Sequence, residues 1–384
     1  FASSPLVPPH PRTHGPIMQR ILGAIPTIKL CLDRGAKAVI LMSHMGRPFG
    51  VANDAMSLRP VATRLAQLLE REVSFLKECV GDEVEAACAD PIEGSVILLE
   101  NLRFHVEEEG KGTVDGTKDG EKVKASKEEV AAFRGSLSKL GDVYVCDAFG
   151  TVHRGHSSMV GVDLPVKVAG LLVLKELQAF SKVVAAPQKP LLAIVGGAKV
   201  SDKIKLIDSL VSKADSIIIC GGMAFTFLKV CFGMKIGKSL FDEGGAEIVQ
   251  SILDKAKANG VEVVLPTDFL CGQEFKNDQE TILATQEDGI PDEWLGLDCG
   301  PASMKLFADK VATSKTVVWN GPAGVFEFDN FAKGTKAILD AVAALHATGG
   351  VGIIGGGDSA TAAANAGMED KVTFVSTGGG ASLE

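Results

Sequence analysis

Residues 191–199 read LLAIVGGAK, and this stretch decides the fold class. Five consecutive apolar residues suit a strand that is buried on both faces, as the strands of parallel sheets are. The glycines that follow, Gly196 and Gly197, allow a tight turn and a close approach of the backbone to a ligand. Apolar runs also end in glycine at residues 216–222, 317–324, 351–357 and 372–380. Helical stretches separate these runs, so the pattern predicts a mainly parallel sheet with helices on both faces.

In the first half of the chain, similar apolar runs end in basic residues instead. AVILMSHMGRP carries His44 and Arg47, and SVILLENLRFH carries Arg103. DVYVCDAFGTVHRGH carries His153, Arg154 and His156. In open α/β sheets, ligands bind at the carboxyl ends of the strands, and we expect these three strands to deliver their basic residues to one sheet edge. The first half is therefore predicted to hold a compact anion and the second a phosphate chain, which together indicate phosphoryl transfer between two substrates.

The composition sets limits on the class of protein. The 384 residues suffice for two domains with separate cores, and the 46% hydrophobic content suits a folded chain. A net charge of −9 argues against general nucleic-acid binding. No run of eighteen uncharged apolar residues is present, so we expect no membrane span. The eight scattered cysteines, without a C-x-x-C pair, favour reduced thiols in a cytoplasmic protein over disulfides or zinc ligands.

The order of elements alternates along the chain. We expect a helix at residues 19–34, a strand at 38–42, a helix through 58–69 and strands at 96–99 and 143–146. The charged, glycine-rich residues 107–127 predict a solvated loop. An amphipathic helix at 171–186 is ended by Pro187 and Pro190. The first sixteen residues, rich in proline, predict an irregular arm.

The segment GGAKVSDKI begins after a predicted strand and should open a helix. Free N–H groups at a helix start favour an anion. Lys199 and Lys203, four residues apart, would share one helix face, where they either bind a phosphate or point into water.

The segment GGGDS also ends a predicted strand. Asp358 would be the N-cap of the following helix, a magnesium ligand, or both. The same glycines fit a G-x-G-x-x-A dinucleotide pattern weakly, because the next predicted strand ends without an acidic residue for the ribose.

Taken together, the segments resemble phosphoglycerate kinase from about Gln19 to Glu384. The resemblance is carried, in order, by LMSHMGRP, LLENLRFH, DAFGTVHRGHSS, GGAKVSDKI, GGMAFTFLK, LDCGP, VVWNGPAGVFE, GGGDS and STGGGASLE. It implies an enzyme of glycolysis with two doubly wound, mainly parallel-sheet domains joined by a helix and hinge. The implied reaction converts 1,3-bisphosphoglycerate and ADP to 3-phosphoglycerate and ATP, with Mg²⁺ bound to the nucleotide.

The resemblance also implies domain limits and roles. It places an arm at 1–16, a 3-phosphoglycerate-binding domain at 17–170, a connecting helix at 171–187 and a nucleotide-binding domain at 188–384. The implied acid-binding residues are Arg20, His44, Arg47, Arg103, His153, Arg154 and His156. The implied nucleotide-binding residues are Gly197, Lys199, Lys203, Gly221, Gly222, Asn320, Pro322, Glu327, Gly356, Gly357, Asp358, Ser359, Thr377, Gly378, Gly379 and Gly380.

The implied mechanism is in-line transfer without a covalent intermediate, because a carboxylate nucleophile needs no general base. Arg20 and Lys199 are the expected catalytic residues that stabilise the charge of the transition state, with Asp358 as the metal ligand. Closure of the two domains would bring the substrates together and exclude water. We expect a monomer that binds neither nucleic acid nor membrane.

The sequence departs from the family pattern at both ends. The proline-rich arm stands where the family has a first strand with a segment like RVDFNVP, and the sequence stops at ASLE, where the family continues. A lost strand would expose apolar area and backbone groups, so we expect lower stability or activity than in the family. Two alternatives remain open: an impaired isoform that binds only Mg-nucleotide, and a nicotinamide-dependent dehydrogenase, which the missing ribose acid disfavours.

Overall fold

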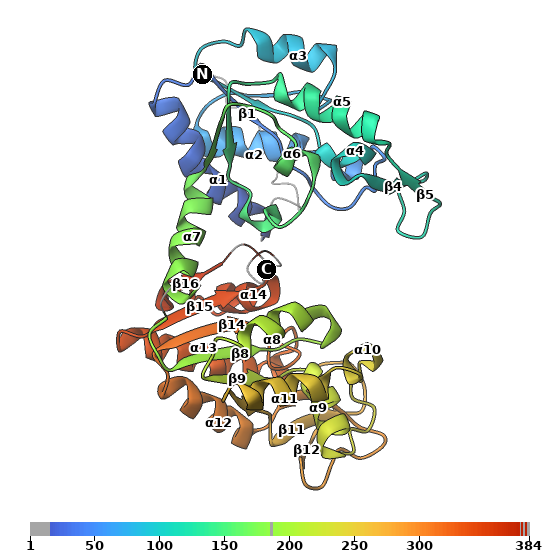
Figure 1. The fold of residues 1–384 in the computed structure, drawn as a ribbon, viewed down its shortest axis with the longest axis vertical. Coiled ribbons are helices and arrows are strands. Elements are labelled where there is room, and N and C mark those ends of the chain that lie inside the picture. The colour runs from blue at the N-terminus through green and yellow to red at the C-terminus, as the bar shows by residue number, and fades with distance from the viewer. Residues whose placement is uncertain (1–15, 185–186, 377, 379–380, 382–384) are drawn as a thin grey trace. The chain divides into compact units, whose positions relative to one another are not determined.

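The computed structural model describes residues 16–184, 187–376, 378 and 381. The proline-rich arm therefore lies outside the described residues, apart from Pro16, which begins the first helix. The chain divides into two compact units, residues 1–175 and 176–384, and the boundary falls within helix α7 (Leu171–Val184). Each unit is described by itself (Figure 1). Among the described residues, no helix is long and apolar enough to cross a membrane.

The first unit contains helices and short strands. Its helices are α1 (Pro16–Asp33), α2 (Arg59–Leu69), α3 (Asp82–Ala89), α4 (Val106–Glu109), α5 (Lys127–Ser138) and α6 (Ser157–Val160). Its strands are β1 (Ala38–Leu41), β2 (Val73–Phe75), β3 (Ser95–Leu98), β4 (Lys111–Thr113), β5 (Lys122–Lys124), β6 (Val143–Cys146) and β7 (Val166–Ala169). Short 3₁₀ turns lie at Asp54–Met56 (η2), Leu102–Phe104 (η3) and Phe149–Thr151 (η4).

The strands of the first unit form separate sheets. Strands β1, β3 and β2 pair in parallel in that order, whereas β6 pairs only with β7, also in parallel. The sequence predicted that the strands ending in basic residues share one sheet edge, and this is wrong for β6. Among the described residues no strand lies between β1 and β6 to join them by hydrogen bonds. Val143, Val166 and Val168 of this pair are consequently about half exposed, at 53%, 46% and 47%.

The two sheets of the first unit nevertheless border one hydrophobic cluster. Ile40 of β1 and Tyr144 of β6 both pack against it, and α5 contributes Phe133 and Leu137. The tyrosine hydroxyl donates to Ser158 O at 2.9 Å, which satisfies its polar end. Helix α5 begins with a capping box between Ser126 and Glu129, which explains why the helix starts here.

The second unit is a doubly wound α/β domain. Its main sheet has the order β10-β9-β8-β14-β15-β16, and every pair in it is parallel. The strands are β8 (Leu191–Val195), β9 (Ser216–Ile219), β10 (Glu262–Val264), β14 (Thr316–Asn320), β15 (Val351–Gly355) and β16 (Phe374–Val375). The helices are α8 (Ile204–Leu210), α9 (Met223–Phe232), α10 (Glu243–Ala246), α11 (Val249–Ala258), α12 (Pro301–Ala312), α13 (Lys333–Ala347) and α14 (Gly357–Asn365), with 3₁₀ turns at Ser201–Lys203 (η5), Asp329–Phe331 (η6) and Glu369–Lys371 (η7).

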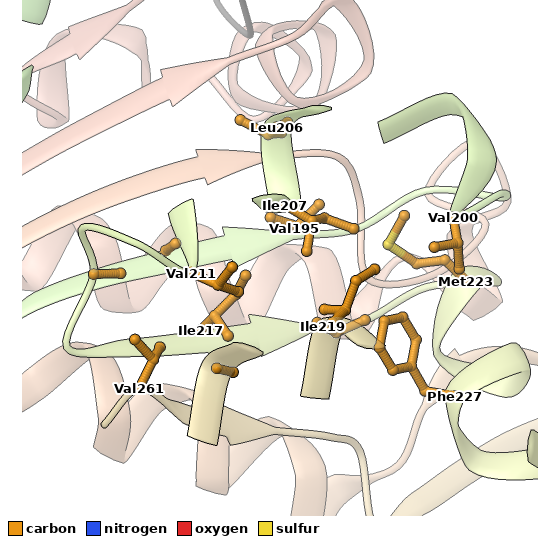
Figure 2. Close-up of a cluster of buried hydrophobic side chains, with 14 of the residues drawn as sticks. Val195, Val200, Leu206, Ile207, Val211, Ile217, Ile219, Met223, Phe227 and Val261 are labelled. Carbon is orange, nitrogen blue, oxygen red and sulfur yellow. The ribbon is translucent and has the colours of Figure 1, made fainter. Parts of the chain in front are cut away.

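Strand β8 is apolar throughout because both of its faces are covered. Ala193 and Val195 lie in one hydrophobic cluster, and Leu192 and Ile194 lie in the cluster on the opposite face. Figure 2 shows the first cluster, in which Ile207 of α8 and Phe227 of α9 approach the ends of the strands. Full burial of each such side chain contributes about 1.5–3 kcal/mol to stability. The sheet therefore holds its strand ends in fixed positions.

A smaller antiparallel sheet, which the sequence did not predict, follows β10. It has the order β12-β11-β13, from β11 (Asp268–Gly272), β12 (Ile282–Thr285) and β13 (Leu295–Cys299). Phe269 of β11 packs on Phe225 of α9 with ring centroids 5.2 Å apart. This inserted sheet leaves the parallel order of the main sheet unchanged.

Candidate functional site

The seven basic residues singled out in the first half come together in the first unit. Arg20 lies on α1, His44 and Arg47 follow β1, Arg103 lies in η3, His153 and Arg154 follow η4, and His156 precedes α6. The pKa of His44 is lowered to about 3, first by burial and then by nearby cations. These cations are Arg103, Arg20, His156 and Arg154. Arg47 likewise contributes to lowering the pKa of Arg103, and His153 to lowering that of His156. All seven side chains therefore form one electropositive cluster, which we name the basic cluster.

Several nitrogen atoms of the basic cluster are buried without a hydrogen-bond partner. Arg154 Nε has no partner, and Arg103 Nε has only an ion pair with Glu109 at 3.4 Å. The ring nitrogen His153 Nδ1, which donates or accepts according to the tautomer, also has no partner. A buried donor without a partner costs about 1–3 kcal/mol, so such groups are rare unless a ligand satisfies them. Arginine is suited to bind carboxylate or phosphate through two parallel hydrogen bonds. The basic cluster is therefore suited to a compact anion.

Two residues of the segment ENL fix the loops that carry the cluster. Asn101 is fully buried, and its Nδ2 donates to Met45 O at 2.8 Å and to Met56 O at 2.9 Å. Its Oδ1 accepts from Arg103 N at 3.1 Å. Glu100 Oε1 accepts from Leu58 N at 2.7 Å. Asn101 is thus a positioning residue for the loop after β1, and no pattern in the sequence indicates this role.

Residues 107–127 are exposed over most of 114–127, as their charge predicted, but they are not a loop throughout. They contain the end of α4 and the antiparallel hairpin of β4 and β5, and Glu108 is only 3% exposed. Glu108 Oε1 accepts from Ser158 Oγ at 2.5 Å, and Glu109 lies 3.4 Å from Arg103 Nε. Glu108 is buried and Glu109 is half-buried, and the basic cluster partly neutralises both carboxylates. The prediction failed at Glu108 because a run of acidic residues was taken as evidence of exposure without considering its partners in the fold.

Strand ends of the second unit are aligned at one edge of the sheet. Val195, Asn320 and Gly355 occupy equivalent positions on β8, β14 and β15. The chain passes outward from β8 to β9 and then returns to β14 on the other side of β8. The gap between the ends of β8 and β14 is therefore the topological switch point, where open α/β sheets bind ligands.

At the switch point, Lys203 and Asn320 contact each other. Lys203 Nζ donates to Asn320 Oδ1 at 2.6 Å and to Asn320 O at 3.2 Å. Burial is the main cause that lowers the pKa of Lys203 to about 8. Asn320 Nδ2 is buried without a hydrogen-bond partner. A lysine and an unsatisfied amide donor at one strand end suit an anionic ligand with several oxygen acceptors.

Lys199 does not share a helix face with Lys203, contrary to the sequence prediction. It lies in the exposed turn between β8 and η5, and the helix proper begins only at Ile204. The turn is held by Val200, which is fully buried, and by Asp242 Oδ2, which accepts from Ser201 N at 2.8 Å. Because Val200 and Asp242 hold this turn, the helix begins later in the sequence than predicted. Lys199 acts electrostatically on Asp242, whose pKa is lowered chiefly by the Ser201 backbone hydrogen bond.

The glycines after β8 and β14 serve first to pack two loops together. A Cβ on Gly196 would lie 2.1 Å from Pro322 O, and one on Gly321 would lie 2.2 Å from Gly196 O. Gly197, at φ +114°, donates through its N–H to Pro322 O at 3.1 Å. Pro322 therefore contributes its carbonyl to this packing. Gly221 adopts φ +68° next to Gly197, and Gly222 lies against the Leu240 side chain.

The segment GGGDS departs from the expected capping pattern. Gly356, at φ +92°, is the N-cap of α14, and Asp358 lies exposed in the first turn, so Asp358 is not the N-cap. A Cβ on Gly357 would meet nothing within 4 Å. Ser359 is fully buried and its Oγ accepts from Gly321 N at 2.7 Å, which ties α14 to the loop after β14.

Asp358 has the surroundings expected of a magnesium ligand. Its carboxylate is exposed and near enough to Lys203 to act on the pKa of that amine. Mg²⁺ bound with a nucleotide commonly takes one or two carboxylates besides phosphates and water. The donor set at the end of β15 therefore fits Mg²⁺ bound together with a phosphate chain.

The other predicted nucleotide-binding residues are Glu327 and four residues near the end of the sequence. Glu327 is exposed in the turn that precedes η6. Gly378 is buried and its N–H donates to Ser376 Oγ at 3.1 Å. Thr377, Gly379 and Gly380 lie outside the described residues.

Asp298 was missed by the sequence analysis. It is 3% exposed at the end of β13, where Oδ1 accepts from Cys299 N at 2.9 Å and Oδ2 from Gly334 N at 2.8 Å. A Cβ on Gly324 would lie 2.2 Å from Asp298 Oδ1, so this carboxyl group supports the loop after β14. Burial raises its pKa to about 7. The only sign in the sequence is one acidic residue in the otherwise uncharged run LGLDCGP.

Comparison with known proteins gives a consistent result over nearly the whole chain. A family model described as phosphoglycerate kinase matches residues 14–384. The phosphoglycerate kinase of Neurospora crassa is 60% identical over 366 residues, which cover 95% of this chain and 87% of the relative. Phosphoglycerate kinase 1 of Homo sapiens is 59% identical over 367 residues, with the same coverage.

Solved structures agree with the sequence relatives. Phosphoglycerate kinase from Coxiella burnetii superposes with a TM-score of 0.78 at 35% identity and covers 95% of this chain and 87% of its own. The enzyme from Pyrococcus horikoshii gives a TM-score of 0.76 at 26% identity, with the same coverage. These relatives favour a phosphoglycerate kinase over the dehydrogenase alternative. The chain belongs to the phosphoglycerate kinase family.

Proposed function

We propose that this chain transfers a phosphoryl group from 1,3-bisphosphoglycerate to Mg-ADP, which gives 3-phosphoglycerate and ATP, and that it also catalyses the reverse reaction. The observation that carries the proposal is that buried donors lack partners at both sets of strand ends. Arg154 Nε lies in the basic cluster, and Asn320 Nδ2 lies at the switch point. Family membership supports the same reaction.

The basic cluster would bind the phosphoglycerate moiety. Arg103 and Arg154 supply planar donors for phosphate or carboxylate oxygens. His44 is neutral at pH 7 because its pKa is about 3, so it would act as a hydrogen-bond partner before the anion arrives. A bound anion would raise that pKa again, because it opposes the surrounding positive charge.

The strand ends of the second unit would bind the nucleotide. Lys203 and Asn320 would contact phosphate oxygens at the ends of β8 and β14, and the start of α14 would supply backbone N–H groups. Asp358 would hold Mg²⁺, which supplies charge neutralisation for the β- and γ-phosphates when bound. Thr377, Gly379 and Gly380 keep their proposed place in this set on the strength of the family motif alone.

The transfer itself needs little covalent chemistry from the protein. The carboxylate of 3-phosphoglycerate is already deprotonated at neutral pH and can act as nucleophile without a base. Arg20 and Lys199, both exposed, would stabilise charge on the transferring group. Such a reaction also requires the two bound substrates to meet, and we propose that closure of the two units provides this.

A coupled assay tests the proposal directly. ATP formation from 1,3-bisphosphoglycerate should be abolished in Arg103→Met and strongly reduced in Lys203→Met, with both variants folded by circular dichroism. The control Lys255→Met, at an exposed ion pair with Asp208, should keep full activity. Undiminished turnover in Arg103→Met would contradict the assignment of the basic cluster.

A second candidate function rests on the divided sheet of the first unit. Because β6 and β7 pair apart from β1, β3 and β2, the basic cluster is carried by two sheets. If this division prevents the basic cluster from binding its anion, the chain would bind Mg-nucleotide but not 3-phosphoglycerate. Titration with Mg-ADP and, separately, with 3-phosphoglycerate distinguishes the two: binding of both supports the phosphotransferase, and binding of nucleotide alone supports the second candidate.

A further inference from the structure

A cluster of three different ligand types lies in the first unit, apart from the basic cluster. Glu78, Cys79 and His105 offer a carboxylate oxygen, a thiol sulfur and an imidazole nitrogen, all within 4.8 Å of one another. Glu78 and Cys79 follow β2, and His105 ends the turn η3 that follows β3. Neither the proposed reaction nor the family motifs quoted above use these three side chains together.

The backbone holds the two segments against each other. Glu100 N donates to Glu78 O at 3.3 Å, and Leu76 N donates to Leu98 O at 3.0 Å, so the chain after β2 stays beside the chain after β3. His105 N donates to Leu102 O at 3.2 Å, which closes its turn. The cluster is therefore built on paired strand ends and does not depend on a chance approach of long side chains.

The side chains are oriented toward one another. His105 Nε2 lies 2.8 Å from Glu78 Oε2, and the imidazole ring packs on Phe133 of α5 with centroids 5.4 Å apart. The Cys79 side chain is fully buried, whereas the Glu78 side chain is 60% exposed and that of His105 is 27% exposed. The set thus has one buried ligand and one side open to solvent, through which an ion and a water can enter.

The local electrostatic field favours a cation. Glu78, Glu108 and Glu100 all act electrostatically on the buried side chain of Cys79. The charged groups with the largest effect on this thiol are thus carboxylates. Cys88, in contrast, is a buried thiol on α3 whose pKa is raised by burial alone.

We propose that Glu78, Cys79 and His105 bind one Zn²⁺ ion, with water as the fourth ligand. Zinc accepts sulfur, imidazole nitrogen and carboxylate oxygen in tetrahedral sites, whereas Mg²⁺ and Ca²⁺ require oxygen ligands. Zinc bond lengths of about 2.0–2.3 Å place the donor atoms about 3.3–3.8 Å apart. The exposed Glu78 side chain can supply the small movement that this requires. Binding replaces the thiol proton by the metal and releases that proton to the buffer.

The test is calorimetric titration of the whole chain with ZnCl₂ in the absence of nucleotide and substrate. We expect His105→Gln and Glu78→Gln to weaken the tightest site by at least about tenfold, since even the loss of an outer partner of a ligand costs about 10- to 100-fold. Cys79→Ser should weaken it further. The matched control Cys88→Ser should leave it unchanged. Titration in buffers of different ionisation enthalpy should show one proton released per ion.

Cobalt(II) provides an independent readout, because a bound thiolate gives a near-ultraviolet charge-transfer band. That band should be present in the unaltered chain and in Cys88→Ser and absent in Cys79→Ser. Unchanged zinc affinity in both His105→Gln and Glu78→Gln would overturn the proposal. These two positions are partly exposed, so the test remains decisive if Cys79→Ser does not fold.

Discussion

Lys203 Nζ lies 2.6 Å from Asn320 Oδ1 and 3.2 Å from the carbonyl oxygen of the same residue, so one ammonium group joins the ends of β8 and β14. The two residues are 117 positions apart in the sequence. This contact fixes the Oδ1 of the asparagine and leaves its Nδ2 buried without a hydrogen-bond partner. The switch point of the sheet thus contains a preformed pair of donors.

Replacement of Asn320 by alanine should weaken binding of Mg-ADP by about tenfold, because one hydrogen bond to a charged group is worth about 1.5–3 kcal/mol. Isothermal titration of the folded variant measures this. Asn259→Ala is the control, since its Nδ2 also donates to a carbonyl, that of Val211, at 3.0 Å but away from the switch point. Equal losses of nucleotide affinity in both variants would contradict the role of Asn320.

The affinity for Mg-ADP should fall as the pH rises through about 8, because Lys203 loses its proton in this range and an anion prefers the charged form. Lys203→Arg should remove this decline, since arginine stays protonated. Titrations from pH 7 to 9.5 compare the two proteins. A decline of the same size in Lys203→Arg would show that another group causes it.

His44 should make the free energy of unfolding depend on pH below 6.5. Its pKa in the folded state is about 3, below the usual 6.5, so the unfolded state binds the proton first as the pH falls. The stabilising contribution is present above about pH 6.5 and is lost progressively toward pH 3. Urea unfolding of the chain and of His44→Gln measures it: the difference in stability between them should shrink with acidification. A constant difference would argue against the shift.

Asp298 should have the opposite pH dependence. Its pKa is raised to about 7 by burial, from an ordinary value near 3.8, so the folded state keeps a proton that the unfolded state loses. Its contribution is present below about pH 4 and is lost as the pH rises through 7. The stability of Asp298→Asn relative to the unaltered chain should therefore improve between pH 4 and 8. Unfolding curves at four pH values suffice to detect this trend.

Asn101→Ala should destabilise the first unit by about 2–4 kcal/mol, because two backbone carbonyls and one backbone N–H lose their partner in a buried position. Binding of 3-phosphoglycerate should weaken as well, since the loop with His44 is no longer held. Asn53→Ala is a suitable control: Asn53 Oδ1 only caps the exposed turn η2 at Ala55 N, which is worth about 1 kcal/mol. Thermal unfolding and titration together distinguish the two variants.

Much of the fold could be predicted from local patterns. Strand β6 has the predicted limits, and β1 and β3 lie within one residue of them, because short apolar runs between polar turns have few alternative structures. The pairing of strands could not be predicted. The separation of β6 and β7 from the other sheet depends on which edges meet, and periodicity carries no information on this.

The candidate site could likewise be predicted only in part. Six of the seven basic residues were identifiable because they follow apolar runs, whereas Arg20, on α1, was named through the family resemblance. Glu108 was not identifiable, because its burial depends on Ser158 and Arg103, which lie elsewhere in the sequence. Lys199 was placed on a helix because propensity alone does not show that Val200 and Asp242 anchor the preceding turn.

The sequence by itself determined the family, the alternation of strands and helices, and the residue types at the strand ends. These depend on order and local chemistry, which the chain carries in full. Only the tertiary structure decided which donors remain without partners, that Asp298 keeps a proton up to about pH 7, and that Glu78 and Cys79 meet His105. Such properties depend on burial and on distances between segments remote in the sequence, because solvent exclusion and electrostatic interaction arise only when those segments pack.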